Sequence, residues 1–86
     1  MTDKFTCIRN YLITYLTARS KGYVKNDTVH YETILNNAGY EYGETRKAQY
    51  ADRQIIKNIL DYYVTIGCIK EYQETDDCKA VTITME

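Results

Sequence analysis

Tryptophan and proline are absent from this chain of 86 residues, and phenylalanine and histidine occur only once each. No stretch approaches the ~18 consecutive apolar residues that a membrane-spanning helix requires. The amino-terminal segment MTDKFTCIRNYL also lacks the apolar run of a secretory signal. We therefore expect a protein with no membrane association that works in the cytoplasm of a cell.

The residues needed for metal binding or catalysis are scarce. His30 is the single histidine, and no CxxC or HxxxH pair occurs, so we predict no metal site. The chain also lacks a glycine-rich phosphate loop, a serine–histidine–aspartate order and paired carboxylates on one helix face. We therefore expect neither an enzyme nor a cofactor.

Positive and negative charges are nearly balanced, with 11 Lys and Arg residues against 12 Asp and Glu residues. This balance argues against a binder of polyanions whose whole surface is basic. It leaves room for a domain with one basic face, so the position of each charge matters more than the sum.

Apolar periodicity predicts two helices in the first half of the chain. The first covers about residues 4–20, with Asp3 as its cap and Gly22 after its end. Thr28 is a plausible cap for a shorter second helix in VHYETILNNAG, which Gly39 would terminate.

A third, longer helix and a β-hairpin are predicted in the second half. The helix covers about residues 44–66 and stops at Gly67. CIKEYQ and CKAVTITM are typical of strands, and ETDD would form the turn between them. At this length we expect one domain, residues 1–86, with an α+β fold that is mostly α.

The third helix has two contrasting faces when its residues are placed about 100° apart. The predicted core face contains Ala48, Ala51, Ile55, Ile59, Tyr63 and Ile66, and is widened by Ile56 and Leu60. The opposite stripe contains Arg46, Tyr50, Arg53 and Lys57, flanked by Gln49 and Gln54. Asp52 is expected to point elsewhere, so the stripe holds no acid before Asp61. An ordinary solvated face remains an alternative, but these residue types are those that contact DNA bases and phosphates.

The segment RQIIKNILDYYVTIGCIKEYQ…KAVTIT resembles the part of winged helix-turn-helix proteins that joins the recognition helix to the wing. Leu60, Gly67 and the pair Cys68-Ile69 occupy the positions of the family's helix end, and Lys70 and Lys79 those of its wing strands. VHYETILNNAG resembles the family's second helix. The small, tyrosine-rich chain is also similar to winged-helix regulators of archaeal viruses, which implies the host cell of a virus as its location.

The resemblance implies a three-helix core with a C-terminal β-hairpin wing. The third helix would enter the major groove of double-stranded DNA, and the wing would lie along the backbone. The candidate DNA-binding residues are Arg46, Lys47, Gln49, Tyr50, Arg53, Gln54, Lys57, Lys70 and Lys79. The implied function is that of a transcription regulator. A protein–protein interaction module on the same fold is the alternative, which the near-neutral charge supports.

Two features depart from the family pattern. The loop YEYGE is longer than the usual tight turn, so the third helix could begin later than residue 44. The expected wing tip carries Glu74, Asp76 and Asp77, which phosphate would repel. The tip is therefore expected to point away from DNA or not to contact it.

A homodimer is expected, because one chain offers few phosphate contacts and a two-fold pair doubles them. The predicted dimer contact is the first helix, around Tyr11, Ile13 and Tyr15. The chain has three cysteines, so at least one is unpaired within it. A four-residue turn would pair Gln73 with Cys78 and leave Cys68 and Cys78 too far apart for a disulfide. The predicted core line of the first helix is formed by Phe5, Ile8, Leu12, Tyr15 and Leu16. Cys7 lies off this line and could form a disulfide with a second chain.

Overall fold

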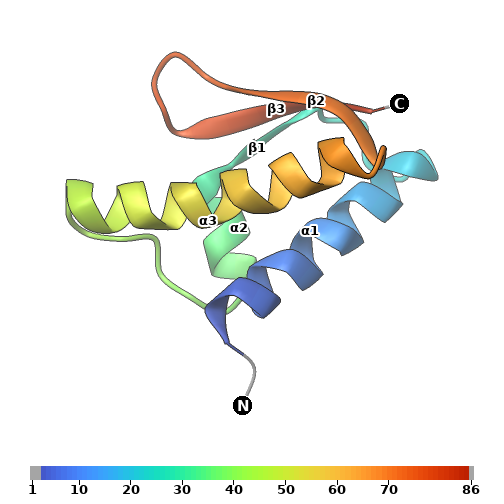
Figure 1. The fold of residues 1–86 in the computed structure, drawn as a ribbon. Helices are drawn as coiled ribbons and strands as arrows, with labels where there is room; N and C mark the ends of the chain where they lie inside the picture. The colour runs from blue at the N-terminus through green and yellow to red at the C-terminus, as the bar shows by residue number, and fades with distance from the viewer. Residues whose placement is uncertain (1–2, 86) are drawn as a thin grey trace.

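The structure is a computed structural model that describes residues 3–85 of the chain (Figure 1). Its elements, in chain order, are α1 (Lys4–Ser20), β1 (Thr28–His30), α2 (Tyr31–Asn37), α3 (Arg46–Thr65), β2 (Ile69–Glu74) and β3 (Ala80–Met85). The three strands form one antiparallel sheet in the order β1-β3-β2. This is the expected α+β fold, mostly helical, with a three-helix core and a C-terminal β-hairpin in a winged-helix arrangement.

The ends of the helices follow the local signals in the sequence. The Asp3 carboxylate accepts a hydrogen bond from the Thr6 N–H at 2.7 Å and caps α1, as predicted. Gly22, Gly39 and Gly67 each follow a helix and have φ angles between 80° and 90°, a left-handed conformation that favours glycine. α3 begins at Arg46, two residues later than residue 44.

The second helix begins at Tyr31, so the prediction of Thr28 as its cap is wrong. Residues 28–30 instead form β1, with Thr28 opposite Thr82 and Val29 opposite Val81. Backbone N–H and C=O groups of this segment form hydrogen bonds with β3. In a helix, the same groups would have bonded to backbone groups four residues away along the chain. The partner strand lies about fifty residues away in the sequence, so local periodicity does not reveal this pairing.

The hairpin has a different register from the one expected. Gln73 pairs with Thr82 and Glu74 with Val81, so Glu74 belongs to β2, and Cys78 lies in a longer turn of residues 75–79. The turn is closed by side chains: the Thr75 hydroxyl donates to Asp77 at 2.6 Å, and the Asp77 carboxylate accepts from the Lys79 N–H at 3.0 Å. These local hydrogen bonds extend the turn beyond the four residues expected.

The core lies between the helices and the inner face of the sheet. From α3 it takes Ile56, Ile59, Leu60 and Tyr63, while Ala51 and Ile66 are exposed. The predicted core face is therefore wrong at Ala51 and Ile66, which face solvent and not the core. Since α3 packs on α1, on α2 and also on β2, the flank that faces the hairpin is buried as well.

Asp52 lies away from the exposed stripe, as expected, and is buried, at 3% exposure. Its carboxylate pairs with the Lys4 ammonium of α1 and accepts from the Gly43 N–H at 3.1 Å. It therefore ties three segments together: the start of α1, the loop before α3 and α3 itself. Within residues 3–85, no helix is long and apolar enough to cross a membrane.

Candidate nucleic-acid interface

The amino-terminal half of α3 presents an exposed surface without an accessible acid. Arg46, Lys47, Tyr50 and Gln54 are all exposed there. Asp52 is the single acidic residue between positions 46 and 60, and it is buried against Lys4. The solvent-facing side of this stretch therefore carries cations, an amide and a phenol, which suit phosphate and base edges.

The predicted stripe of cations is divided by the hairpin. Arg46 and Tyr50 face solvent, whereas Arg53 and Lys57 are partly buried and turn toward β2. The Lys57 Nζ lies 3.1 Å from Oε2 of Glu74, and the Arg53 Nε lies 3.9 Å from the same oxygen. Gln49 is also partly buried and donates to the Gly43 carbonyl at 2.9 Å. The sequence pattern could not show this division, because Glu74 comes from another element.

Glu74 is therefore not a free acid at the wing tip. Besides the two cations of α3, its carboxylate accepts a hydrogen bond from the hydroxyl of the fully buried Tyr31. Burial acts to raise the pKa of Glu74, but hydrogen bonds from Tyr31, Lys57 and Cys78 outweigh it and hold the pKa below its ordinary value. Burial and the neighbouring carboxylate raise the pKa of the Tyr31 hydroxyl far above its ordinary range, so this group remains a donor.

The two other acids of the tip differ from Glu74 and from each other. Asp76 and Asp77 are both exposed. The hydrogen bonds from the Thr75 hydroxyl and the Lys79 N–H lower the pKa of Asp77, so its negative charge helps to hold the turn. Asp76 is therefore the tip acid with the least structural role among the described contacts.

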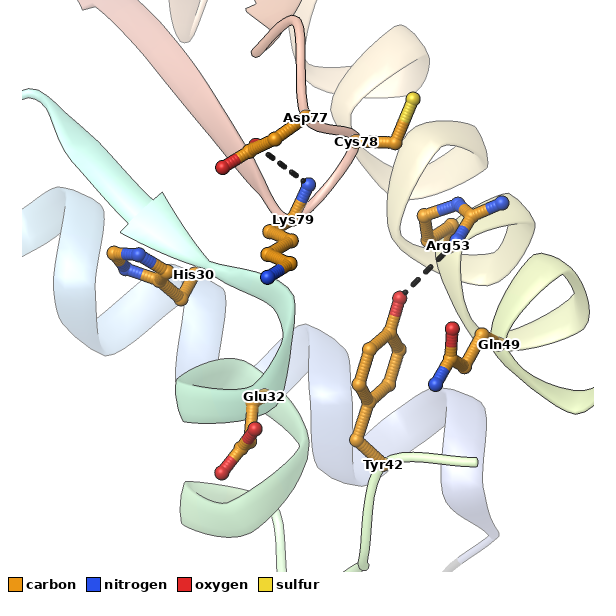
Figure 2. Close-up of a pocket in the computed structure, with 8 residues that line it drawn as sticks. All are labelled: His30, Glu32, Tyr42, Gln49, Arg53, Asp77, Cys78 and Lys79. Atoms are coloured by element: carbon orange, nitrogen blue, oxygen red, sulfur yellow. Dashed lines mark hydrogen bonds between the residues drawn. The ribbon is translucent and has the colours of Figure 1, made fainter. Parts of the chain in front are cut away.

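The two predicted wing cations lie at opposite ends of the hairpin. Lys79 is exposed in the hairpin turn and lines a cavity that Arg53 of α3 also lines (Figure 2). Lys70 is exposed at the irregular start of β2, close to the end of α3. The structure thus brings Lys79, but not Lys70, to the amino-terminal half of α3.

A polar cavity of about 280 Å³ lies between the hairpin turn, the junction of β1 with α2, and α3 (Figure 2). It is lined by His30, Glu32, Tyr42, Gln49, Arg53, Asp77, Cys78 and Lys79. The Arg53 Nη1 donates to the Tyr42 hydroxyl at 3.3 Å, which holds the guanidinium at the cavity wall. Because both cations and acids line the cavity, its charge is mixed. Sequence reasoning missed it, since its walls come from four separate segments.

An apolar groove of about 270 Å³ lies between α1 and α3. Phe5 and Tyr62 line it and are 45% and 59% exposed. The Tyr63 hydroxyl is buried beside it without a hydrogen-bond partner among the described residues. Burial raises the pKa of this hydroxyl. Contact with another protein is one use of an exposed apolar groove.

The residues predicted for a dimer contact do not share one exposed face. Tyr15 is buried, and its hydroxyl donates to the Asn26 carbonyl at 2.6 Å. Tyr11 is partly buried and stacks on Tyr15, with ring centroids 6.5 Å apart. Ile13 remains accessible, at 46% exposure. The first helix thus offers less free tyrosine surface than its sequence suggested.

The three cysteines are free within the described part of the chain, with Cys7 partly buried and Cys68 and Cys78 exposed. Residues 3–85 contain no group of three or more histidine, cysteine or acidic side chains placed to hold a metal ion. Comparisons with family models, curated proteins and solved structures find no match to this chain.

Proposed function

We propose that this protein binds double-stranded DNA in a sequence-specific manner and acts as a transcription regulator, with α3 in the major groove. The observation that carries this proposal is the acid-free exposed face of the amino-terminal half of α3. Asp52, the one acid in its first fifteen residues, is buried and paired with Lys4. In a winged-helix arrangement, this helix is the element that projects into the groove.

The exposed residues have distinct roles in the proposed complex. Arg46 and Lys47 lie in the first turn of α3, where the helix dipole adds to their attraction for phosphate. Gln54 and Tyr50 lie farther along the same surface and can reach base edges: Gln pairs with adenine, and Tyr contacts phosphate or the thymine methyl. Lys79 adds a phosphate contact from the hairpin turn.

We also propose that the protein acts as a homodimer through the first helix. One chain has three exposed cations near the amino-terminal half of α3, namely Arg46, Lys47 and Lys79. Each neutralised phosphate contributes about −0.9 to the slope of log affinity against log salt, so a single chain would bind weakly at cellular salt. Two-fold pairing doubles these contacts. Ile13 and Phe5 are the exposed apolar side chains of α1 available for the contact.

A salt titration of DNA affinity tests the proposed function. The wild type should bind a labelled duplex with an affinity that falls steeply with salt, as measured by fluorescence anisotropy. Replacing both Arg46 and Lys47 with alanine should make the slope shallower by about 1.8 per chain, at about 0.9 per lost phosphate contact. Replacing both Lys21 and Lys25 with alanine is the matched control, because it removes two exposed cations that follow the end of α1. No measurable binding at low salt would refute the proposal.

The alternative function, a protein–protein interaction module, is favoured by the apolar groove of Phe5 and Tyr62. A partner that covers this groove could also supply the hydrogen bond that the buried Tyr63 hydroxyl lacks. Such a module would show almost no DNA binding at any salt concentration. The same titration therefore separates the two functions.

A further inference from the structure

Glu74 lies where the hairpin passes over α3, and its carboxylate faces donors from two helices. Lys57 and Arg53 approach it from α3 at 3.1 and 3.9 Å, and the Tyr31 hydroxyl approaches it from α2. The three charged side chains are only 20–29% exposed. Partial burial limits screening by solvent and salt, so these ion pairs are stronger than fully exposed pairs.

The two cations held by Glu74 are also suited to DNA. Arg53 and Lys57 lie four residues apart on α3, on the flank that begins with Arg46 and Tyr50. A phosphate oxygen accepts charge-assisted hydrogen bonds from the same N–H groups as a carboxylate does. A phosphate that approaches this flank must therefore share or displace the bonds already made to Glu74.

We propose that Glu74 is an internal competitor of DNA phosphate: in the free protein it holds Arg53 and Lys57 against the hairpin, and DNA must draw them away. This inference rests on the proposed DNA-binding function and concerns the regulation of that interface. Tyr31 is fully buried, so its hydroxyl anchors the Glu74 carboxylate in place. The movement on binding belongs to the long side chains of Arg53 and Lys57. The ion pairs lower the affinity for DNA and the number of phosphates neutralised.

The same contacts could serve the opposite role, in which Glu74 positions Arg53 for a productive DNA contact. The two roles predict effects of opposite sign when the charge of Glu74 is removed. Loss of a competitor strengthens DNA binding, whereas loss of a positioning residue weakens it. The sign of the change is therefore the decisive measurement.

Glu74→Gln tests the competition, because the amide oxygen can still accept from Tyr31 while the negative charge is gone. Asp76→Asn is the matched control: it makes the same change in net charge at the exposed tip, away from the cations of α3. Affinities for a random-sequence fluorescent duplex are measured over a series of salt concentrations. Circular dichroism on heating verifies that each variant folds.

Glu74→Gln should bind DNA about fivefold more tightly than wild type does. This factor corresponds to about 1 kcal/mol, the upper end of the range for one surface ion pair. Its salt slope should be steeper by about 0.9 for each cation released, and so by about 1.8 if both reach phosphate. Asp76→Asn should change the affinity by less than about twofold, as expected for one screened charge.

Four results would overturn the inference. Equal tightening by both variants would mean that net charge alone acts, and weaker binding by a folded Glu74→Gln would identify a positioning residue. If wild type binds with a steep salt slope and Glu74→Gln is unchanged, the competition fails while the DNA-binding function stands. If no variant binds DNA, the proposed function fails and the inference with it.

A second measurement covers the case in which Glu74→Gln does not fold. Carboxyl ¹³C NMR of the wild type follows the titration of Glu74 in the free protein and in the DNA complex. Loss of its two cations to DNA should raise the pKa of Glu74 more than that of Asp77, which local hydrogen bonds of the turn hold down. Equal shifts of the two carboxyl groups would overturn the proposal.

Discussion

Asp52→Ala should be among the most damaging single substitutions in this protein, although it removes only one acidic side chain. The change deletes the acceptor of the Gly43 N–H, at 3.1 Å, and the counter-ion of Lys4. It also leaves a small cavity at a position where the residue is now only 3% exposed. The loop before α3 and the start of α1 would both lose their connection to α3.

The magnitude follows from two contributions. Breaking a fully buried ion pair by removing one partner costs about 3–5 kcal/mol. The Lys4 side chain is 35% exposed, however, so its ammonium can recover much of its hydration, and this contribution must be reduced. A hydrogen bond to a charged group contributes about 1.5–3 kcal/mol, and this part remains for Gly43. We therefore expect a loss of about 2–4 kcal/mol in the free energy of unfolding.

Urea unfolding followed by circular dichroism measures this loss. Asp52→Asn keeps an oxygen acceptor for Gly43 but removes the charge, so it should cost less than Asp52→Ala. Asp76→Ala, at an exposed turn position, should change the stability by less than about 0.5 kcal/mol. If Asp52→Ala behaves like Asp76→Ala, the assignment of Asp52 as a buried link between three segments is wrong.

Three further tests probe the packing and the electrostatics. Ile56→Ala, at a fully buried position, should lower the free energy of unfolding by about 2–5 kcal/mol. Ile66→Ala, at a half-exposed position, should lower it by less than about 1 kcal/mol. Similar losses for the two variants in urea unfolding would contradict the observed core face. Gly43→Ala should destabilise the fold by about 1–3 kcal/mol, because a Cβ at this position would lie 2.5 Å from the Cβ of Ala48. An unchanged midpoint of urea unfolding would contradict this close packing. The folded-state pKa of Glu74 is lowered, so its stabilising contribution is present at neutral pH and lost as the pH falls below the ordinary glutamate pKa of about 4.3. Wild type should therefore lose more stability on acidification than Glu74→Gln, and parallel pH profiles would refute this.

The sequence by itself determined the start of the first helix, the carboxyl ends of the three helices and the fold class. Asp3 caps α1 through the N–H of Thr6, three residues away, and Gly22, Gly39 and Gly67 adopt left-handed conformations just after the helices. These signals are local, because a cap or a left-handed glycine acts within one or two turns of chain. The order of three helices and a hairpin followed from them.

Only the tertiary structure decided β1 and the hairpin register. The pairing of Val29 with Val81 joins segments that are distant in sequence, and no periodicity in either segment specifies the other. The turn of residues 75–79 likewise depends on which hydrogen bonds Thr75 and Asp77 make when the two strands are aligned. Strand pairing is a property of two segments together, so one segment read alone does not reveal it.

The candidate interface shows the same division between local and distant information. Helical spacing correctly exposes Arg46 and Tyr50 on α3, but it places Arg53 and Lys57 in the same free stripe. Their pairing with Glu74 arises because the hairpin folds back over α3, and the strength of each pair depends on distance and burial. Distance and burial between residues far apart in the chain exist only once the chain has folded.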